Sequence, residues 1–318
     1  MTTPDLGGML AVARRAVRAA AALCMQVAAA GPHRLEKIGR EPVTLADYGS
    51  QALILGLLAE SFPDHGVLAE EGSAHLLAEG GVSGVAAVAA FVADATGVEC
   101  SAEDLVGRID HRGGRGTPLW AVDPIDGTKG FLRGDQFAVA VGLIDGGRPI
   151  AGVLGCPRLT IAGIEGVLVW GGPGLGAFVE PIAVGDPTPI AVSTVDEARR
   201  ARVLGSVETD HGDPEVIRRA VARAGLGGGW VRIDSQAKYA AVAAGLAEAY
   251  LRPRNRADWR ERVWDHAAGA AIVTGAGGRV TDLDGLDLDF STGGTLENNR
   301  GVLATNGLVH GMVLGVVG

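Results

Sequence analysis

The segment Trp120–Lys129 combines two carboxylates with a sharp turn and the start of a helix. An apolar strand ends at Asp123, Pro124 fixes its own φ angle and turns the chain, and Asp126 follows three residues after Asp123. Gly127-Thr128 can then open a helix. Carboxylates bind a hard cation, and N–H groups at a helix start bind a phosphate. Taken alone, the same pattern also describes a common turn in which an aspartate caps the helix.

Three further segments place acids at the ends of apolar elements. Glu70 and Glu71 close an apolar strand, and adjacent acids repel unless a cation lies beside them or they point apart. Asp265 stands at the start of an apolar helix, and Asp47 in the first turn of another. Each has an ordinary alternative: a solvated strand end for the glutamates, an N-cap for Asp265 and compensation of the helix dipole for Asp47.

These acids offer only oxygen ligands, which suit Mg²⁺ and not zinc. The cysteines support that choice, because Cys24, Cys100 and Cys156 form no CxxC pair and no Cys/His cluster. Their odd number and wide spacing predict reduced thiols, most simply small buried hydrophobes, in a cytosolic protein.

The elements that must position these acids can be predicted from periodicity. Helices are expected over Leu6–Ala30 and Thr44–Phe62, then a strand over Gly66–Glu71, while 72–116 is partly helix and partly loop. An antiparallel-rich sheet follows, with a hairpin at Asp145–Gly147. Its predicted strands are Leu119–Val122, Phe137–Ile144, Pro149–Leu154, Ile164–Trp170 and Gly176–Val179.

The second half alternates between strands and helices, which predicts a second, α/β sheet. The predicted strands are Val203–Ser206, Trp230–Ile233, Ala249–Arg252 and Arg279–Thr281, and the predicted helices are Pro214–Ala224, Gln236–Leu246 and one from Asp265. We place the boundary near Pro187–Ser193, which gives domains over 1–190 and 191–318.

Charge and hydropathy exclude several classes of function. With 318 residues and a formal net charge of -9, the chain lacks the basic surface that nucleic-acid binding needs. The apolar stretch Val82–Ala93 is shorter than the ~20 residues of a membrane span. Arg14, Arg15 and Arg18 make the first helix amphipathic rather than a signal peptide. We therefore expect a cytoplasmic protein with neither nucleic acid nor membrane as a partner.

One acidic run is a decoy for a calcium site. Asp282–Asp289 begins like an EF-hand loop, but positions six and twelve of that loop, which need glycine and an acid, are Asp287 and Gly293. We interpret the run as turns beside strands.

Together and in this order, the acidic segments resemble the inositol-monophosphatase superfamily, from about Lys37 to Asn306. The motifs that match are Asp123–Thr128, Trp264–Gly269, Glu70-Glu71 and Val43–Asp47. The resemblance implies a fold of the α/β (α+β) class, a layered α-β-α-β-α sandwich with its site at the junction of the two halves.

Other segments are similar to the bisphosphate-nucleotidase branch of that superfamily. They are Asp126–Ala138, Gly174–Phe178, the loop Val207–Asp213 and Ile233–Tyr239, whereas inositol monophosphatases typically carry Thr-Asn-Phe after the Gly-Thr pair. This branch implies removal of the 3'-phosphate from 3'-phosphoadenosine 5'-phosphate and its sulfated form. The alternatives are another phosphatase of the superfamily, acting on inositol phosphates or fructose 1,6-bisphosphate, and a non-catalytic binding protein.

The resemblance also implies roles for single residues. The metal ligands are Glu70, Asp123, Asp126, Asp265 and the carbonyl oxygen of Ile125. They would hold two or three Mg²⁺ ions, with Mn²⁺ as a substitute and Li⁺ as an inhibitor. Asp47 and Thr128 would position and activate the attacking water. The N–H groups of Gly127 and Thr128 would hold the scissile phosphate, and Glu71 would support the metal ligands.

Substrate contacts are implied for Ser235 and Lys238, which we place at i and i+3 on one helix face. The ordinary alternative is a solvated helix lysine with a serine cap. His211 lies in a loop that the family uses near the base, although a plain surface histidine fits equally well. The arginine-rich stretch Arg252–Arg262 is interpreted as a solvated charged segment, with binding of an anionic group as the alternative. The partner expected is a small bisphosphorylated nucleotide, and a monomer is expected rather than a dimer.

Overall fold

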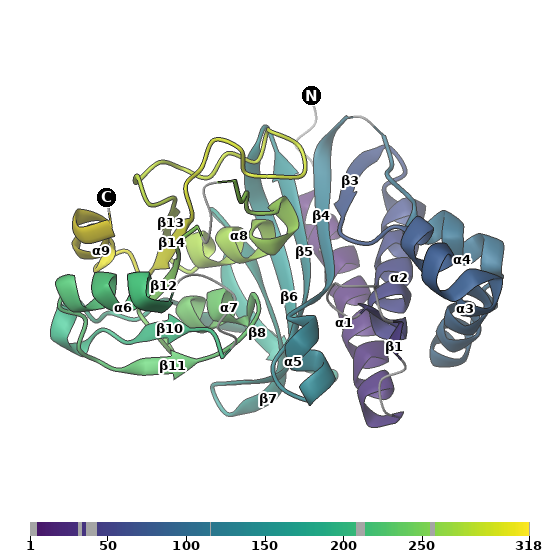
Figure 1. Cartoon of the computed structure of the whole chain (residues 1–318), viewed down its shortest axis with the longest axis horizontal. Helices are drawn as coiled ribbons and strands as arrows, with labels where there is room; N and C mark the ends of the chain where they lie inside the picture. Colours follow the sequence, from purple (N-terminus) through teal and green to yellow (C-terminus); the bar gives the residue numbers. More distant parts are fainter. Residues whose placement is uncertain are drawn as a thin grey trace.

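The chain folds into five layers in which helices and sheets alternate (Figure 1). The computed structural model describes residues 5–30, 34–35, 43–114, 116–207, 214–254 and 258–317. In order, the layers are helices α1 (Leu6–Ala30) and α2 (Leu45–Ser61), a seven-stranded sheet, helices α7 (Ala237–Ala243) and α8 (Ala267–Gly275), a five-stranded sheet, and helices α6 (Pro214–Arg223) and α9 (His310–Val317). The predicted α-β-α-β-α sandwich is confirmed.

The large sheet is antiparallel except at one edge, where β3 and β4 run parallel. Its strands follow chain order: β3 (His65–Ala69), β4 (Gly116–Asp126), β5 (Ala138–Asp145), β6 (Arg148–Ile161), β7 (Ile164–Gly172), β8 (Gly176–Pro181) and β9 (Thr188–Ile190). The predicted hairpin is confirmed: Gly146 and Gly147 have φ angles of 56° and 74°, the left-handed conformation that a tight two-residue turn needs.

The second sheet is mixed, and its strand order differs from the chain order. The order is β11 (Trp230–Arg232), β10 (Val203–Gly205), β12 (Ala249–Arg252), β14 (Val302–Thr305) and β13 (Arg279–Thr281). The alternating pattern predicted four of these strands, but β14, β9 and α9 were missed. A division into two domains near residue 190 stays a prediction.

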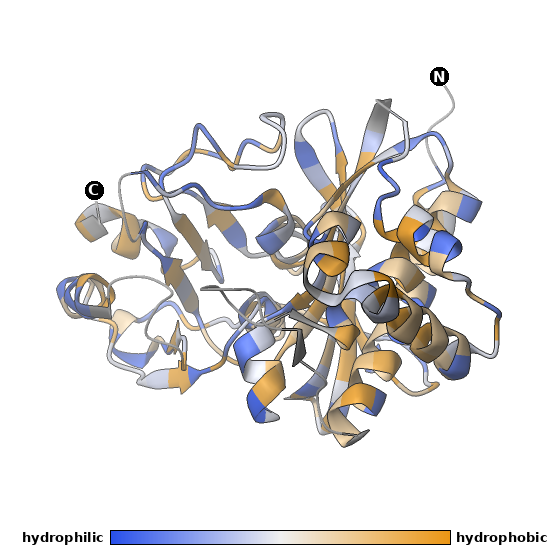
Figure 2. Ribbon diagram, turned by 45° about the vertical axis from the view of Figure 1, so that its right-hand side comes forward, coloured by the Kyte–Doolittle hydropathy of each residue, from blue (hydrophilic) through white to orange (hydrophobic). Residues whose placement is uncertain are grey.

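Successive side chains along the strands of the large sheet point to opposite faces and pack into two separate cores. Val139 and Val141 face α1 and α2, while Ala138 and Ala140 face the layer of α7 and α8. A third core lies between the small sheet and the pair α6 and α9. Figure 2 shows hydrophobic colour along the helices that flank the large sheet and hydrophilic colour gathered in many of the loops.

The stretch that the sequence left uncertain is mainly helical. It forms α3 (Ser73–Thr96) and α4 (Ala102–Ile109), beside a two-stranded sheet of β1 (Arg34–Leu35) and β2 (Val43–Thr44). Ser101 and Asp104 begin α4 with a reciprocal capping box. A membrane-crossing helix is absent from the described part of the chain, since none of its helices combines the needed length with the needed hydropathy.

The calcium decoy is a turn, as predicted. The Asp282 carboxylate is buried and accepts from the N–H groups of Asp284 and Leu286 on one oxygen, and from Asn299 Nδ2 and Arg300 N–H on the other. Because donors already occupy both oxygens, this carboxylate stabilises the loop. The three cysteines are free thiols, with Cys24 and Cys156 buried and Cys100 partly exposed.

Candidate active site

The two carboxylates of the central motif reach the same side of the sheet because β4 is bulged. In the pairing with β5, Asp123 lies opposite Ala140 and Asp126 lies opposite Ala138, so three steps on β4 match two on β5. An odd spacing would normally place the two acids on opposite faces, but the extra residue restores the same face. That face is the one toward α7 and α8, where Ala138 and Ala140 also point.

Asp126 does not act as a helix cap, so the ordinary interpretation of the turn is wrong. Helix α5 (Thr128–Arg133) follows Gly127, which occupies the cap position with a φ angle of 87° and no side-chain cap. The Asp126 carboxylate instead accepts a 2.6 Å hydrogen bond from the backbone N–H of Gln236. Thr128 Oγ1 donates to the carbonyl of Ile125 at 3.1 Å.

Glu70 is brought beside this motif by the parallel pairing of β3 and β4. Its backbone N–H donates to the carbonyl of Val122, the residue immediately before Asp123. The next residue, Glu71, is buried, so the interpretation of the pair as a solvated strand end is wrong for Glu71. Glu70 itself is exposed, as that interpretation expects.

Helix α2 fixes both acidic segments from beneath. Gln51 is fully buried and makes a reciprocal pair with the Glu71 backbone, donating to its carbonyl at 2.7 Å and accepting from its N–H at 2.9 Å. Ser50 donates to the carbonyl of Pro124 at 3.0 Å. Asp47 lies in the first turn of the same helix, as dipole compensation expects, but its side chain is buried.

Asp265 enters from the second half of the chain, at the end of a 3₁₀ turn, Val263–Asp265. It does not cap α8; its carboxylate accepts from Arg252 Nη2 at 3.2 Å. The small residues that follow explain how it arrives there. A Cβ on Gly142 would lie 2.7 Å from the Cβ of Ala267, and one on Gly269 would lie 2.3 Å from the Tyr239 ring. Only glycine at these places lets α8 sit between the sheet and α7.

The carboxylates raise one another's pKa values. Burial raises the pKa of Asp123 well above its ordinary value, and the charges of Glu70 and Asp126 raise it further. Loss of hydration at its carboxylate raises the pKa of Glu70, with added contributions from the charges of Glu71, Asp265 and Asp47. The pKa of Asp126 and that of Asp265 are raised mainly by burial. Negative charge at this junction is therefore costly unless a cation neutralises it.

The donor set fits a hard cation. Asp123 Oδ1 is buried without a hydrogen-bond partner among the described residues. The charge of the neighbouring Glu70 adds to the effect of burial in raising the pKa of this carboxyl group. Unpaired carboxylate oxygens in a cluster with no thiolate suit Mg²⁺.

The substrate residues are placed differently from the prediction. Ser235 precedes α7 and has a φ angle of 66°, which is not a helical conformation. The prediction that Ser235 and Lys238 share one helix face is therefore wrong. Lys238 is not a solvated lysine: it is buried, its Nζ donates to the Ser235 carbonyl at 3.2 Å, and burial lowers its pKa to about 8. His211 lies outside the described residues.

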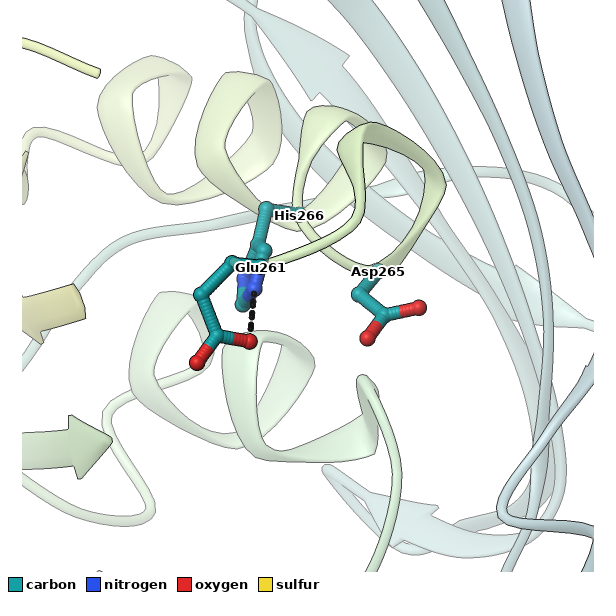
Figure 3. Close-up of side chains that lie close together, drawn as sticks. All are labelled: Glu261, Asp265 and His266. Carbon is teal, nitrogen blue, oxygen red and sulfur yellow. Dashed lines mark hydrogen bonds and ion pairs between the residues drawn. The ribbon is translucent and has the colours of Figure 1, made fainter. Parts of the chain in front are cut away.

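Sequence reasoning missed a group of buried side chains around Asp265. Arg252 was interpreted as part of a solvated segment, but it is largely buried and bridges Asp265 and Glu261. Figure 3 shows Glu261, Asp265 and His266 close together. One side-chain N or O atom from each lies within 4.8 Å of the others. The available signal was the position of Arg252 at the end of the apolar strand β12. Gln51 and Gln236 gave no comparable signal.

The comparisons with known proteins agree with this geometry. The model of the inositol monophosphatase family matches residues 5–316. The chain belongs to this family. A 3'(2'),5'-bisphosphate nucleotidase of Oryza sativa is 39% identical, covering 93% of this chain and 90% of the rice protein. One of Emericella nidulans is 35% identical, covering 89% of each. An inositol monophosphatase from Anabaena, 24% identical, has the same fold, with a TM-score of 0.67 over 98% of this chain and 96% of that one.

As a member of the inositol monophosphatase family, the chain is a phosphatase. The geometry adds that acids from both halves of the chain converge on one junction. The charge of Asp265 raises the pKa of Asp126, so the two carboxylates lie near each other. A cation there would tie the two halves together.

Gln51→Leu tests whether α2 holds the acidic segments in place. The change leaves the Glu71 N–H buried without its acceptor, which costs about 1–3 kcal/mol of unfolding free energy. We also expect a smaller rise in melting temperature on adding Mg²⁺, because Glu70 loses its fixed position. Urea unfolding in EDTA and thermal melts with Mg²⁺ measure the two effects.

The matched control is Gln26→Leu, the same substitution at an exposed position of α1. It should leave both measurements unchanged. Wild-type stability together with a wild-type response to Mg²⁺ in Gln51→Leu would contradict the assignment.

Proposed function

We propose that the chain is a Mg²⁺-dependent 3'(2'),5'-bisphosphate nucleotidase. It would remove the 3'-phosphate from 3'-phosphoadenosine 5'-phosphate and its sulfated form, leaving AMP or adenosine 5'-phosphosulfate and inorganic phosphate. The observation that carries the proposal is the convergence of carboxylates on one junction, where the buried Asp123 has an oxygen without a hydrogen-bond partner among the described residues. The named relatives, up to 39% identical, support the choice of substrate.

The metal would be held by oxygen atoms from both halves of the chain. The proposed ligands are Glu70, Asp123, Asp126, Asp265 and the carbonyl of Ile125. When bound, two or three Mg²⁺ ions would supply positive charge to the phosphoryl oxygens and lower the pKa of the attacking water. Mn²⁺ would substitute, since it accepts the same oxygen ligands.

Asp47 and Thr128 are proposed to position the water and take up its proton. Thr128 Oγ1 already donates to the carbonyl of Ile125, which fixes the hydroxyl beside the central motif. The buried carboxylate of Asp47 lies close enough to Glu70 to raise its pKa. In the reaction, the water oxygen bonds to phosphorus, the bond to the 3' oxygen breaks, and the leaving oxygen takes up a proton from solvent.

Lys238 and Ser235 are proposed to hold the second phosphate, while the N–H groups of Gly127 and Thr128 hold the scissile one. Lys238 lies near the proposed metal ligands, since its charge lowers the pKa of Asp126, and Ser235 lies beside Gly127, where an added Cβ would come within 3.1 Å of the Ser235 Cβ. Ser235 Oγ accepts from the Ala237 N–H, which leaves its hydroxyl hydrogen for a phosphate oxygen. With a pKa of about 8, Lys238 remains mostly protonated at neutral pH, and a bound phosphate would raise that value.

The remaining features of the proposal concern the setting. Free thiols throughout and the small phosphorylated substrate favour a cytoplasmic enzyme. We keep the expectation of a monomer.

Phosphate release from a substrate panel tests the proposal. The wild-type protein should hydrolyse 3'-phosphoadenosine 5'-phosphate faster than inositol 1-phosphate or fructose 1,6-bisphosphate, lose activity in EDTA and regain it with Mg²⁺. Asp126→Asn should lower the rate by several orders of magnitude yet keep the fold, because asparagine can still accept from the Gln236 N–H. LiCl should inhibit where KCl at equal concentration does not.

Exposed Asp64→Asn is the control for that substitution and should retain wild-type rates. Full activity after exhaustive chelation would refute metal dependence. A preference for inositol 1-phosphate would show that the substrate is an inositol phosphate and not the nucleotide.

Lys238→Met tests where the second phosphate binds, because methionine keeps the length of the side chain without its charge. Losing a charge-assisted contact costs about 1.5–3 kcal/mol. That corresponds to a roughly tenfold to hundredfold loss in kcat/KM for the bisphosphate. Adenosine 3'-monophosphate, which lacks the second phosphate, should be affected much less. An equal loss for both substrates would show that Lys238 acts on the fold or the metal centre instead.

A further inference from the structure

The cluster of Glu261, Asp265 and His266, drawn in Figure 3, is contacted by the guanidinium group of Arg252. Glu261 Oε2 lies 2.9 Å from Arg252 Nε and 3.2 Å from His266 Nε2. Arg252 also reaches Asp265, through Nη2 at 3.2 Å. A positive charge therefore sits where a metal ion would have to enter between Glu261 and Asp265. We conclude that Glu261 acts on protein groups and is not itself a metal ligand.

The hydrogen bonds of this cluster continue into α7. His266 Nδ1 lies 2.7 Å from the hydroxyl of Tyr239. Because an ionised carboxylate only accepts, His266 Nε2–H donates to Glu261, while Nδ1 shares a hydrogen bond with the Tyr239 hydroxyl. The Tyr239 ring is locked in turn, since it packs directly on the backbone of Gly269 in α8. A continuous buried chain thus runs from Tyr239 through His266 and Glu261 to Arg252.

Arg252 is shared between two carboxylates with different duties. Asp265 is a proposed metal ligand, and every contact it makes with a guanidinium competes with a cation for the same oxygens. Glu261 offsets this competition because it binds Arg252 through Nε and balances its charge. Arg252 and Glu261 have side-chain exposures of only 15% and 4%, so water screens their interaction little.

We propose that Glu261 is a positioning residue of the metal centre that acts through Arg252, and that the Tyr239–His266 pair holds Glu261 in place. The inference rests on the proposed function only in taking Asp265 as a metal ligand. Without the Glu261 charge, the guanidinium would turn fully to Asp265 and weaken the hold on the cation.

Binding of Mn²⁺ to the metal-free protein tests this inference without substrate. Glu261→Gln should lower the Mn²⁺ affinity, measured by electron paramagnetic resonance or calorimetry, about tenfold to hundredfold. The matched control is Glu297→Gln, which removes a Glu–Arg pair at an exposed position, with Arg260. It should bind Mn²⁺ as the wild type does.

A second variant separates action through Arg252 from a general loss of fold. The double variant Glu261→Gln/Arg252→Gln removes the guanidinium that competes for Asp265, so its Mn²⁺ affinity should recover above that of Glu261→Gln. An affinity as low as, or lower than, that of the single variant would overturn the proposal. A wild-type affinity in Glu261→Gln would overturn it as well.

Tyr239→Phe keeps the inference testable if Glu261→Gln does not fold. This change removes only the hydroxyl at the far end of the chain, and it should weaken Mn²⁺ binding less than the Glu261 change. An unchanged affinity in Tyr239→Phe would refute the role of the Tyr239–His266 pair. A wild-type protein that binds Mn²⁺ but hydrolyses no bisphosphorylated nucleotide would contradict the proposed function alone.

Discussion

Repulsion among buried carboxylates is the constraint on which the rest of this structure depends. Asp123 is enclosed by protein, and the charges of Glu70, Asp126 and Asp265 all raise its pKa. A fold does not gather such groups without cost, because each ionised acid in a low-dielectric setting opposes the next. The surrounding elements hold these carboxylates together, and a bound cation would compensate their negative charge.

Those elements come from distant parts of the sequence and act on backbone as much as on side chains. The β4 bulge turns two acids to one face, and Gln51 forms two hydrogen bonds with the backbone of Glu71, the residue after Glu70. On the other side, the Gln236 N–H holds Asp126, while its side chain donates to the carbonyl of Trp264, next to Asp265. One residue of the α7 segment thus connects the acids of both halves of the chain.

Glycine and alanine allow the layers to come this close. The start of α8 lies on the large sheet at Gly142 and Gly152, where a Cβ would meet Ala267 or Ala268, and it meets α7 at Gly269. These contacts bring Asp265 to the junction and place His266 against Tyr239. The small residues that follow Asp265 are therefore needed for packing, which the motif alone does not reveal.

The sequence was most informative where chemistry is local. The spacing of Asp123, Pro124 and Asp126 correctly predicted two acids ahead of a helix start, but the expected strand end at Asp123 was wrong, because β4 continues through a bulge to Asp126. The long helices and the hairpin follow from periodicity and turn residues. Contacts between distant segments were not predictable in the same way. Arg252 is buried because it forms ion pairs with Glu261 and Asp265. The arginine-rich sequence around it does not predict those partners.

Backbone conformation was a second source of error. Ser235 was expected on a helical face, yet its left-handed φ angle places it outside α7, and the N–H of the next residue is committed to Asp126. Such a geometry is rare for a residue other than glycine, so no propensity predicts it. The structure explains the left-handed conformation of Ser235, because it allows the N–H of the next residue to donate to Asp126.

Unfolding free energies of the wild type and Asp123→Asn, measured in EDTA and in Mg²⁺, test the central claim most directly. An acid whose pKa is raised in the folded state destabilises that state at pH values above its ordinary pKa. At neutral pH in EDTA, the asparagine variant should therefore be more stable than the wild type, by about 1 kcal/mol or more. In Mg²⁺ the order should reverse, because only the wild type gains from the cation. A variant less stable than the wild type under both conditions would contradict the account.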